Sequence, residues 1–238
     1  MQPYLTLILP AYNEAGAIAA TIESTIGWFE SQGYRWEIIV AADGTDGTRE
    51  VVQSRFAGGG RVRVIGHPER RGKGRGVREA VALASGSIIG YADADNKVPI
   101  EEYAKLDVWF GRGFDVVIGS RAMEKSVILQ SQPAYRRIGS KVFNRAMRAF
   151  TGLTDVADSQ CGFKFFRHDA AKRIFAGQRI DGYMFDVEIL VLARRAGYRM
   201  QQVPIRWRDD GDTRLQLLRG NLQNLRDLWR IRMGAARL

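Results

Sequence analysis

The chain has 238 residues, of which 45% are hydrophobic, and a formal net charge of +10 at pH 7. This length and apolar content suffice for one large α/β domain, so residues 1–238 are predicted to share a single core. The sequence has no run of about eighteen apolar residues and no leader-like start, so we expect a cytoplasmic protein. The lone Cys161 excludes an internal disulfide, and two scattered histidines argue against a zinc site, so any metal must be held by oxygen.

The positive charge is concentrated in two segments. Residues 121–148 carry seven basic side chains against Glu124 alone, and residues 214–238 carry six against Asp227 alone. These two segments account for the whole excess, which favours an enzyme with one basic rim that binds an anionic partner. A nucleic-acid-binding module is the alternative from another functional class.

In the first 120 residues, short apolar runs alternate with amphipathic stretches. The runs predict strands at 4–9, 36–41, 62–65, 87–92 and 115–118. The stretches predict helices at 17–31, 48–56, 76–84 and 101–110. This alternation predicts a mostly parallel central sheet with helices on both faces. Ligands of such sheets bind beyond the carboxyl ends of the strands, so the residues that end the strands are the candidate site.

A different pattern follows Gly119. A basic, helix-like segment leads to a strand at 159–166, two further helices and a strand at 200–207. The chain then ends with leucines and Trp229 at three- and four-residue spacing, interleaved with arginines. This end, residues 213–238, is predicted to form a basic amphipathic helix that either packs on the core or lies on anionic lipid.

Two carboxylates, Asp93 and Asp95, directly follow the apolar run that ends at Ala92. Carboxylates at this spacing, where a strand becomes a loop, can jointly hold one hard divalent cation, and the cation can hold a diphosphate. Taken alone, the same pattern is more often a solvated turn. Residues 70–76 add a glycine-rich basic loop that opens a helix, where Lys73 and backbone N–H groups can bind phosphate; its alternative is a solvated basic turn.

The strand ends together resemble the family 2 glycosyltransferases, which are inverting enzymes of GT-A fold that use a metal-bound nucleotide sugar. The resemblance covers about the first 190 residues, in the family's order. It rests on Leu9-Pro10-Ala11-Tyr12-Asn13-Glu14, Ala42-Asp43-Gly44-Thr45-Asp46-Gly47-Thr48, Arg71-Gly72-Lys73-Gly74, Tyr91-Ala92-Asp93-Ala94-Asp95, Gly119-Ser120-Arg121 and Asp158-Ser159-Gln160-Cys161-Gly162-Phe163-Lys164. The last motif and Phe185-Asp186-Val187-Glu188 are most similar to the dolichyl-phosphate glucosyltransferase and mannosyltransferase branch, the glucosyl side in particular.

The resemblance implies a nucleotide-sugar-binding half at 1–120 and an acceptor-binding half at 121–212. It places the donor against Pro10, Ala11, Tyr12, Glu14, Asp43, Lys73, Asp93, Ala94, Asp95 and Gln160. It also implies Mg²⁺ or Mn²⁺, held by Asp95 and Asp93. We expect Asp95 to be the main ligand and Asp93 to lie nearer the ribose, because mannosyl-phosphate relatives can offer a further ligand where this chain has Lys97, and an ammonium cannot ligate a metal. A second departure is Ala42, which leaves Asp43 as the one carboxylate for the base or ribose.

The basic segments bear on the acceptor. An alcohol needs a base to remove its proton, whereas a phosphate monoester is largely dianionic at neutral pH and chiefly needs cations. A phosphorylated acceptor is therefore favoured, and the predicted phosphate-binding residues are Arg121, Arg136, Arg137, Lys141 and Arg214. Asp158 is the first candidate for a base or acceptor-positioning carboxylate, and Asp186 is the second. The predicted catalytic residues are therefore Asp158, Asp186 and Asp95. For both candidates, a helix cap or a buried ion pair is the alternative role.

The sequence thus predicts an inverting hexosyltransferase that moves glucose or mannose from UDP-glucose or GDP-mannose to a polyprenyl (dolichyl) phosphate. It would act at the cytoplasmic membrane face as a peripheral protein. A family 2 glycosyltransferase with a soluble alcohol or glycan acceptor is the first alternative, and a non-catalytic nucleic-acid-binding module is the second.

Overall fold

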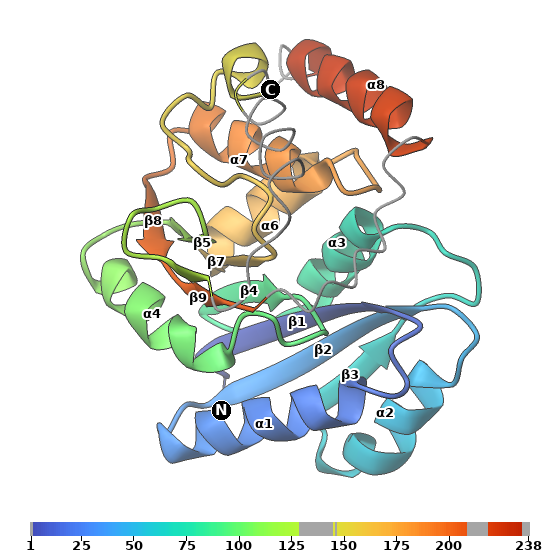
Figure 1. Cartoon of the computed structure of the whole chain (residues 1–238). Helices are drawn as coiled ribbons and strands as arrows, with labels where there is room; N and C mark the ends of the chain where they lie inside the picture. Colours follow the sequence, from blue (N-terminus) through green and yellow to red (C-terminus); the bar gives the residue numbers. More distant parts are fainter. Residues whose placement is uncertain (1, 129–144, 146, 209–218, 235–238) are drawn as a thin grey trace.

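The computed structural model describes residues 2–128, 145, 147–208 and 219–234 (Figure 1). Its strands are β1 (Leu5–Tyr12), β2 (Trp36–Asp43), β3 (Val62–Ile65), β4 (Ile88–Ala92), β5 (Val116–Ser120), β6 (Val127–Ile128), β7 (Phe163–Arg167), β8 (Met200–Pro204) and β9 (Arg206–Trp207). Its α-helices are α1 (Ile18–Ser31), α2 (Thr48–Phe56), α3 (Lys73–Leu83), α4 (Tyr103–Gly111), α6 (His168–Gly177), α7 (Phe185–Arg195) and α8 (Arg219–Gly234). Short 3-10 helices span Ala57–Gly59 and Ile100–Glu102.

Seven strands form one central sheet in the order β3-β2-β1-β4-β7-β5-β8. Strands β1 to β4 are parallel, as are β5 and β8, while β7 lies antiparallel between β4 and β5. The β4 and β5 strands are buried along their whole length, as expected for a sheet that is covered on both faces. The mostly parallel α/β sheet predicted from the sequence is therefore confirmed.

Helices cover both faces of this sheet. In Figure 1, α1, α2 and α4 lie on one side of it, and α3, α6 and α7 lie on the other. Each layer has its own apolar core. Ile18, Ile22 and Phe29 of α1 belong to the first core, and Val77 of α3 and Ile174 of α6 belong to the second. These side chains recur at helical spacing, which is why the amphipathic stretches form helices at this surface.

The antiparallel β7 matters most for the position of the site. Because β7 runs against β4, its first residue, Phe163, pairs with Ala92 at the carboxyl end of β4. Residues 158–162, which lead into β7, are consequently brought to the same edge of the sheet as Asp93 and Asp95.

Helix α3 begins at Lys73, three residues before the helix predicted at 76–84. Gly72 precedes it with a φ of 108°, a backbone conformation that favours glycine. A Cβ at Gly72 would also lie 2.4 Å from the carbonyl oxygen of Asp181. The glycine thus lets the start of α3 pack tightly against Asp181, which fixes Lys73 in the first turn of the helix.

The described part of the chain contains no helix that combines the length and the apolarity needed to cross a bilayer.

Candidate active site

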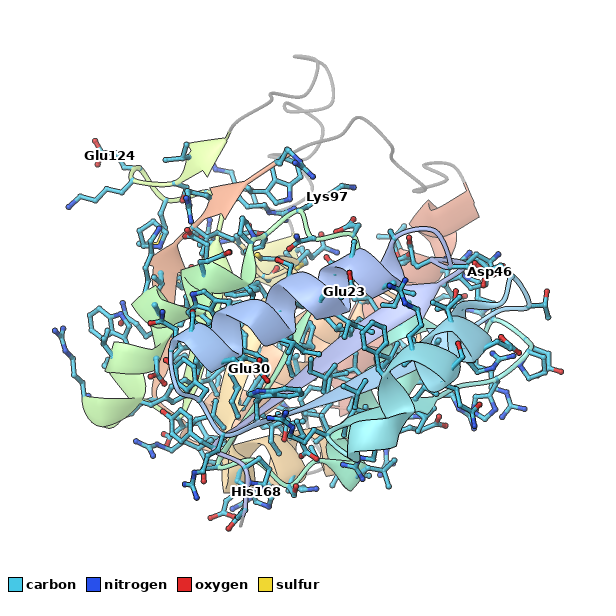
Figure 2. The ribbon with its side chains drawn as sticks, turned by 90° about the horizontal axis from the view of Figure 1, so that it is seen from below. Glu23, Glu30, Asp46, Lys97, Glu124 and His168 are labelled. Atoms are coloured by element: carbon cyan, nitrogen blue, oxygen red, sulfur yellow. The ribbon has the colours of Figure 1, made fainter. Side chains whose placement is uncertain are left out.

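Four chain segments meet at the carboxyl edge of the sheet. Tyr12 at the end of β1 pairs with Asp43 at the end of β2, and Ala92 at the end of β4 pairs with the start of β7. Figure 2 shows Lys97, in the loop after β4, at one end of the molecule. His168 follows the far end of the antiparallel β7 and lies at the opposite end. The predicted donor-binding residues are thus gathered at one edge, as expected for a sheet of this type.

Asp43 connects β2 to the loop before α3. Its Oδ1 accepts a hydrogen bond from the backbone N–H of His67 at 3.2 Å, and its Oδ2 accepts one from the N–H of Arg71 at 2.7 Å. In the same loop, the Arg70 guanidinium lies 4.4 Å from the centre of the Tyr12 ring. These contacts form a small cationic and aromatic corner at the end of β1.

The residues after Tyr12 are held from the side of α2. The Thr48 hydroxyl accepts a hydrogen bond from the N–H of Glu14 at 3.0 Å, and Asp46 accepts one from the N–H of Ala15 at 2.9 Å. Pro10 and Ala11 lie within β1 itself, opposite Ala41 and Ala42 of β2. The predicted donor-binding segment therefore has a fixed backbone.

Lys73 and Asp93 form a close ion pair, with 2.5 Å between Nζ and Oδ1. Burial alone would favour a neutral amine, but Asp93 and Asp186 raise the pKa of Lys73 above its ordinary value, so the ammonium persists. On the other side of Asp93 stands Gly162, where a Cβ would lie 2.1 Å from Oδ2. The segment before β7 therefore reaches Asp93 only because residue 162 is glycine.

Among the described residues, Lys97 contacts Asp95 through both its side chain and its backbone. The Lys97 Nζ lies 3.1 Å from its Oδ2, and the backbone N–H of Lys97 donates to its Oδ1 at 3.2 Å. Between the two aspartates, Ala94 is buried, and its carbonyl accepts a hydrogen bond from the Thr21 hydroxyl at 2.8 Å. This contact anchors the loop so that both carboxylates lie at the surface.

The two carboxylates suit a divalent cation that is shared with a substrate. The Asp93 and Asp95 side chains are 43% and 36% exposed, so both are accessible to a ligand. Within the described ranges, no cluster of three or more histidine, cysteine or acidic side chains is placed to hold a metal. Magnesium is commonly held by only one or two carboxylates together with substrate phosphates, and this donor set fits that arrangement.

Asp158 is buried and locked onto Arg121. Its two oxygens accept hydrogen bonds from Nε at 2.8 Å and Nη2 at 3.0 Å, and the backbone N–H of Arg121 donates to Oδ2 at 3.0 Å. Burial alone would favour the protonated acid, but Arg121 outweighs this effect and holds the pKa of Asp158 below its ordinary value. The guanidinium also lies 5.4 Å from the centre of the Trp207 ring.

Asp186 belongs to a fully buried cluster that sequence reasoning did not foresee as a unit. It accepts hydrogen bonds from the Lys164 ammonium and from the Tyr91 hydroxyl. Lys164 also donates to the carbonyl oxygen of Cys161 at 2.6 Å. The cluster therefore joins β4, β7 and α7 and holds the loop that precedes β7. Burial raises the pKa of Cys161 to about 12, so its thiol stays protonated.

A comparison with known protein families identifies the family of this chain. The family described as glycosyl transferase family 2 matches residues 6–175 of the chain. The chain belongs to glycosyl transferase family 2.

Two relatives of this family 2 chain carry the same kind of name. A dolichyl-phosphate beta-glucosyltransferase of Trichomonas vaginalis is 29% identical over 225 residues, which are 90% of this chain and 66% of the relative. A dolichyl-phosphate beta-glucosyltransferase of Drosophila melanogaster is 31% identical, with 95% of this chain and 74% of the relative covered. The chain thus spans about two thirds to three quarters of these relatives.

A solved structure shows the shared fold of the family 2 chain. Glucosyl-3-phosphoglycerate synthase from Mycobacterium tuberculosis, crystallised with Mn²⁺, UDP and phosphoglyceric acid, superposes with a TM-score of 0.68. It is 20% identical, and the match covers 99% of this chain and 79% of that chain. The predicted family and the predicted GT-A fold are confirmed.

The remaining predicted residues of the family 2 site fall into two groups. Gln160 lies before β7, with its Nε2 3.7 Å from the sulfur of Met184. The predicted acceptor residues Arg136, Arg137, Lys141 and Arg214 lie outside the described residues. A sequence signal for the unforeseen cluster does exist: Lys164 interrupts the apolar run Phe163-Lys164-Phe165-Phe166, and a cation on a buried strand requires a buried partner.

Proposed function

We propose that this family 2 chain transfers glucose or mannose, with inversion, from UDP-glucose or GDP-mannose to a polyprenyl phosphate at the cytoplasmic membrane face. The names of its relatives support a dolichyl-phosphate acceptor and favour the glucosyl donor. The solved neighbour that holds UDP and Mn²⁺ supports a metal-assisted nucleotide-sugar donor. The observation that carries the choice of acceptor is the Arg121–Asp158 pair.

Asp158 is poorly suited to act as a general base. A base for an alcohol works best with a pKa near the operating pH, whereas Arg121 keeps the pKa of Asp158 below that of an ordinary aspartate. Both of its oxygens are already occupied by the guanidinium. Asp158 is therefore assigned a positioning role: it fixes Arg121, which binds the acceptor phosphate.

Asp186 does not replace it as a base. Its carboxylate is buried against Lys164 and Tyr91, so an acceptor alcohol has no access to it. A phosphate monoester with a second pKa of about 6 needs no such base, because at pH 7 it is already mostly dianionic. The acceptor side thus suits a nucleophile that arrives charged.

On the donor side, Tyr12, Glu14 and Asp43 are assigned to the base and ribose. Lys73, at the first turn of α3, is assigned to the diphosphate, where its charge and the N-terminus of the helix act together. Asp95 is the main candidate ligand for Mg²⁺ or Mn²⁺, with Asp93 beside it. A cation bound there would stabilise the negative charge that gathers on the leaving nucleoside diphosphate.

Asp158→Asn tests the assignment of the acceptor. If Asp158 only positions Arg121, turnover with dolichyl phosphate should fall by about tenfold or less, and the pH profile between 6 and 9 should keep its shape. A loss of at least a thousandfold, with the acidic limb removed from the pH profile, would favour the alcohol-acceptor alternative. The direct assay supplies UDP-glucose or GDP-mannose with Mn²⁺ and dolichyl phosphate, and absence of a lipid-linked hexose with both donors rejects the acceptor.

The outer face of α8 supports peripheral membrane contact. Leu225, Trp229 and Met233 follow one another at four-residue spacing and are 58%, 59% and 54% exposed, while Leu228 on the opposite side is buried. Together with Arg226 and other arginines, this apolar stripe is typical of a helix that lies on anionic lipid.

Vesicle flotation tests this contact. Trp229→Ser should weaken flotation with anionic vesicles several-fold. Leu83→Ser, which changes a similarly exposed apolar side chain on α3, should leave it unchanged. Equal effects of the two substitutions would reject α8 as the contact surface.

A further inference from the structure

Each acidic side chain at the centre of the candidate site has its own cation. Lys73 pairs with Asp93, and Lys97 pairs with Asp95. On the acceptor side, Arg121 pairs with Asp158 and Lys164 pairs with Asp186. These four pairs are electrically neutral together. A divalent cation that binds here must therefore compete with an ammonium that already neutralises its ligand.

The two lysines of the donor side are held very differently. Lys73 lies 2.5 Å from Asp93, and its ammonium packs 5.8 Å and 5.9 Å from the ring centres of Tyr91 and Phe185. The Lys97 ammonium lies farther from its partner, at 3.1 Å from Oδ2 of Asp95. Both pairs are similarly exposed, so the longer contact of Lys97 and the aromatic packing of Lys73 decide between them. Asp95 is therefore the carboxylate from which a cation can displace a lysine.

The backbone of Lys97 has a contact that does not involve Asp95. Its carbonyl oxygen accepts a hydrogen bond from the N–H of Arg208 at 3.0 Å, which ties the loop to the end of β9. A lysine stem with four rotatable carbons then carries the ammonium a few ångströms within the same site. A diphosphate held next to Asp95 lies within that range.

We propose that Lys97 is a displaceable counter-ion: it neutralises Asp95 until a divalent cation takes the carboxylate, and the released ammonium then binds the diphosphate of the donor. This inference rests on the proposed function, since it assigns the metal to Asp95 and the diphosphate to the same edge. Its consequence is energetic coupling. The metal binds weakly alone, and metal and diphosphate strengthen each other by the same factor.

Mn²⁺ affinity, measured by isothermal titration calorimetry with and without UDP, tests the proposal without requiring turnover. Lys97→Met should bind Mn²⁺ alone about three- to tenfold more tightly than the unmodified chain, because the competing ammonium is gone. The same substitution should reduce the factor by which UDP strengthens Mn²⁺ binding. A structural lesion would weaken both measurements, so opposite signs are specific to a displaced counter-ion.

Lys125→Met is the matched control, because Lys125 is an exposed lysine in the turn before β6. It should behave as the unmodified chain does, and Lys97→Arg should retain most of the coupling. If Lys97→Met melts early, Lys97→Gln repeats the measurement with a polar side chain of similar length.

Two results overturn the inference and are distinguishable. If Mn²⁺ binds in the presence of UDP but Lys97→Met leaves the affinity for Mn²⁺ alone unchanged or lower, the role of Lys97 is rejected while the proposed function stands. If no variant binds Mn²⁺ even with UDP, the metal assignment of the proposed function fails and the inference fails with it.

Discussion

The donor side and the acceptor side of the candidate site treat their carboxylates in opposite ways. Asp93 and Asp95 on the donor side are roughly 40% exposed, and each is paired with one lysine. Asp158 and Asp186 on the acceptor side are buried, and each is fixed by a cation and at least one further hydrogen bond. Carboxylates of the first kind can exchange a partner for a ligand. Those of the second kind hold other groups in place.

This difference supports the proposed division of roles between the two sides. Exposed acidic groups cost little to keep charged, so the proposed donor side would be able to bind and release a metal with each substrate. Buried pairs are costly to break, since the remaining partner is left charged and dry. The acceptor side is therefore a rigid frame for Arg121 and for the loop before β7. The predictions below test this contrast through the free energy of unfolding.

The largest effect is expected at the buried cluster. Lys164→Met leaves Asp186 charged and without its cation, which should lower the free energy of unfolding by about 3–5 kcal/mol, measured by urea denaturation. The double variant Lys164→Met/Asp186→Asn should regain much of the lost unfolding free energy, because the neutral asparagine can still accept a hydrogen bond from the Tyr91 hydroxyl. A loss below about 1 kcal/mol for the single substitution would mean that Asp186 is hydrated, and the contrast would fail.

The second effect lies where the two sides touch. Gly162→Ala places a Cβ 2.1 Å from Oδ2 of Asp93, so the loop before β7 or the carboxylate must move. We expect a loss of about 1–3 kcal/mol in unfolding free energy and at least a hundredfold loss of turnover, since a small misplacement in a catalytic site is costly.

Gly27→Ala is the control for this substitution, because no atom lies within 4 Å of the added Cβ in α1. It should stabilise the chain by about 0.5–1 kcal/mol. Normal turnover of Gly162→Ala would show that the loop and Asp93 are positioned independently.

Much of the fold and of the donor edge was predictable, and the parts that were not have a physical reason. The alternating apolar runs and the motifs at the strand ends predicted the sheet, its parallel strands and the gathering of Asp43, Lys73, Asp93 and Asp95 at one edge. These features follow from local periodicity and from the geometry of parallel strands.

Pairing between distant residues is what local patterns do not encode. Nothing near Asp158 in the sequence indicates that it pairs with Arg121, because the two are brought together by the pairing of β7 with β5. The sequence predicted that Lys97 cannot ligate a metal. Its contact with Asp95 was not predicted, because it depends on the conformation of the loop after β4. The antiparallel direction of β7 was the missing element, since it brings residues 158–162 to the donor edge.

The third prediction concerns pH. Because the pKa of Asp158 in the folded chain lies below its ordinary value of 3.8, the ionised carboxylate stabilises the fold at neutral pH, and this contribution is lost as the pH falls through the folded-state pKa. Asp158→Asn should therefore cost about 1–2 kcal/mol at pH 7, and the difference from the unmodified chain should shrink below pH 4. A difference that stays constant from pH 7 to pH 3, measured by urea denaturation, would contradict a charged pair with Arg121.

The smallest change in stability should accompany one of the largest changes in activity. Asp95→Asn removes a pair that solvent already weakens, so the free energy of unfolding should change by about 0–1 kcal/mol. Turnover should nevertheless be abolished, because Asp95 is the main proposed metal ligand, whereas Asp93→Asn should first weaken donor binding. Urea denaturation and turnover measured on the same preparations separate the two properties. Equal and mild losses of activity in both variants would return the pair to an ordinary solvated turn, and the donor side would then differ from the acceptor side in exposure alone.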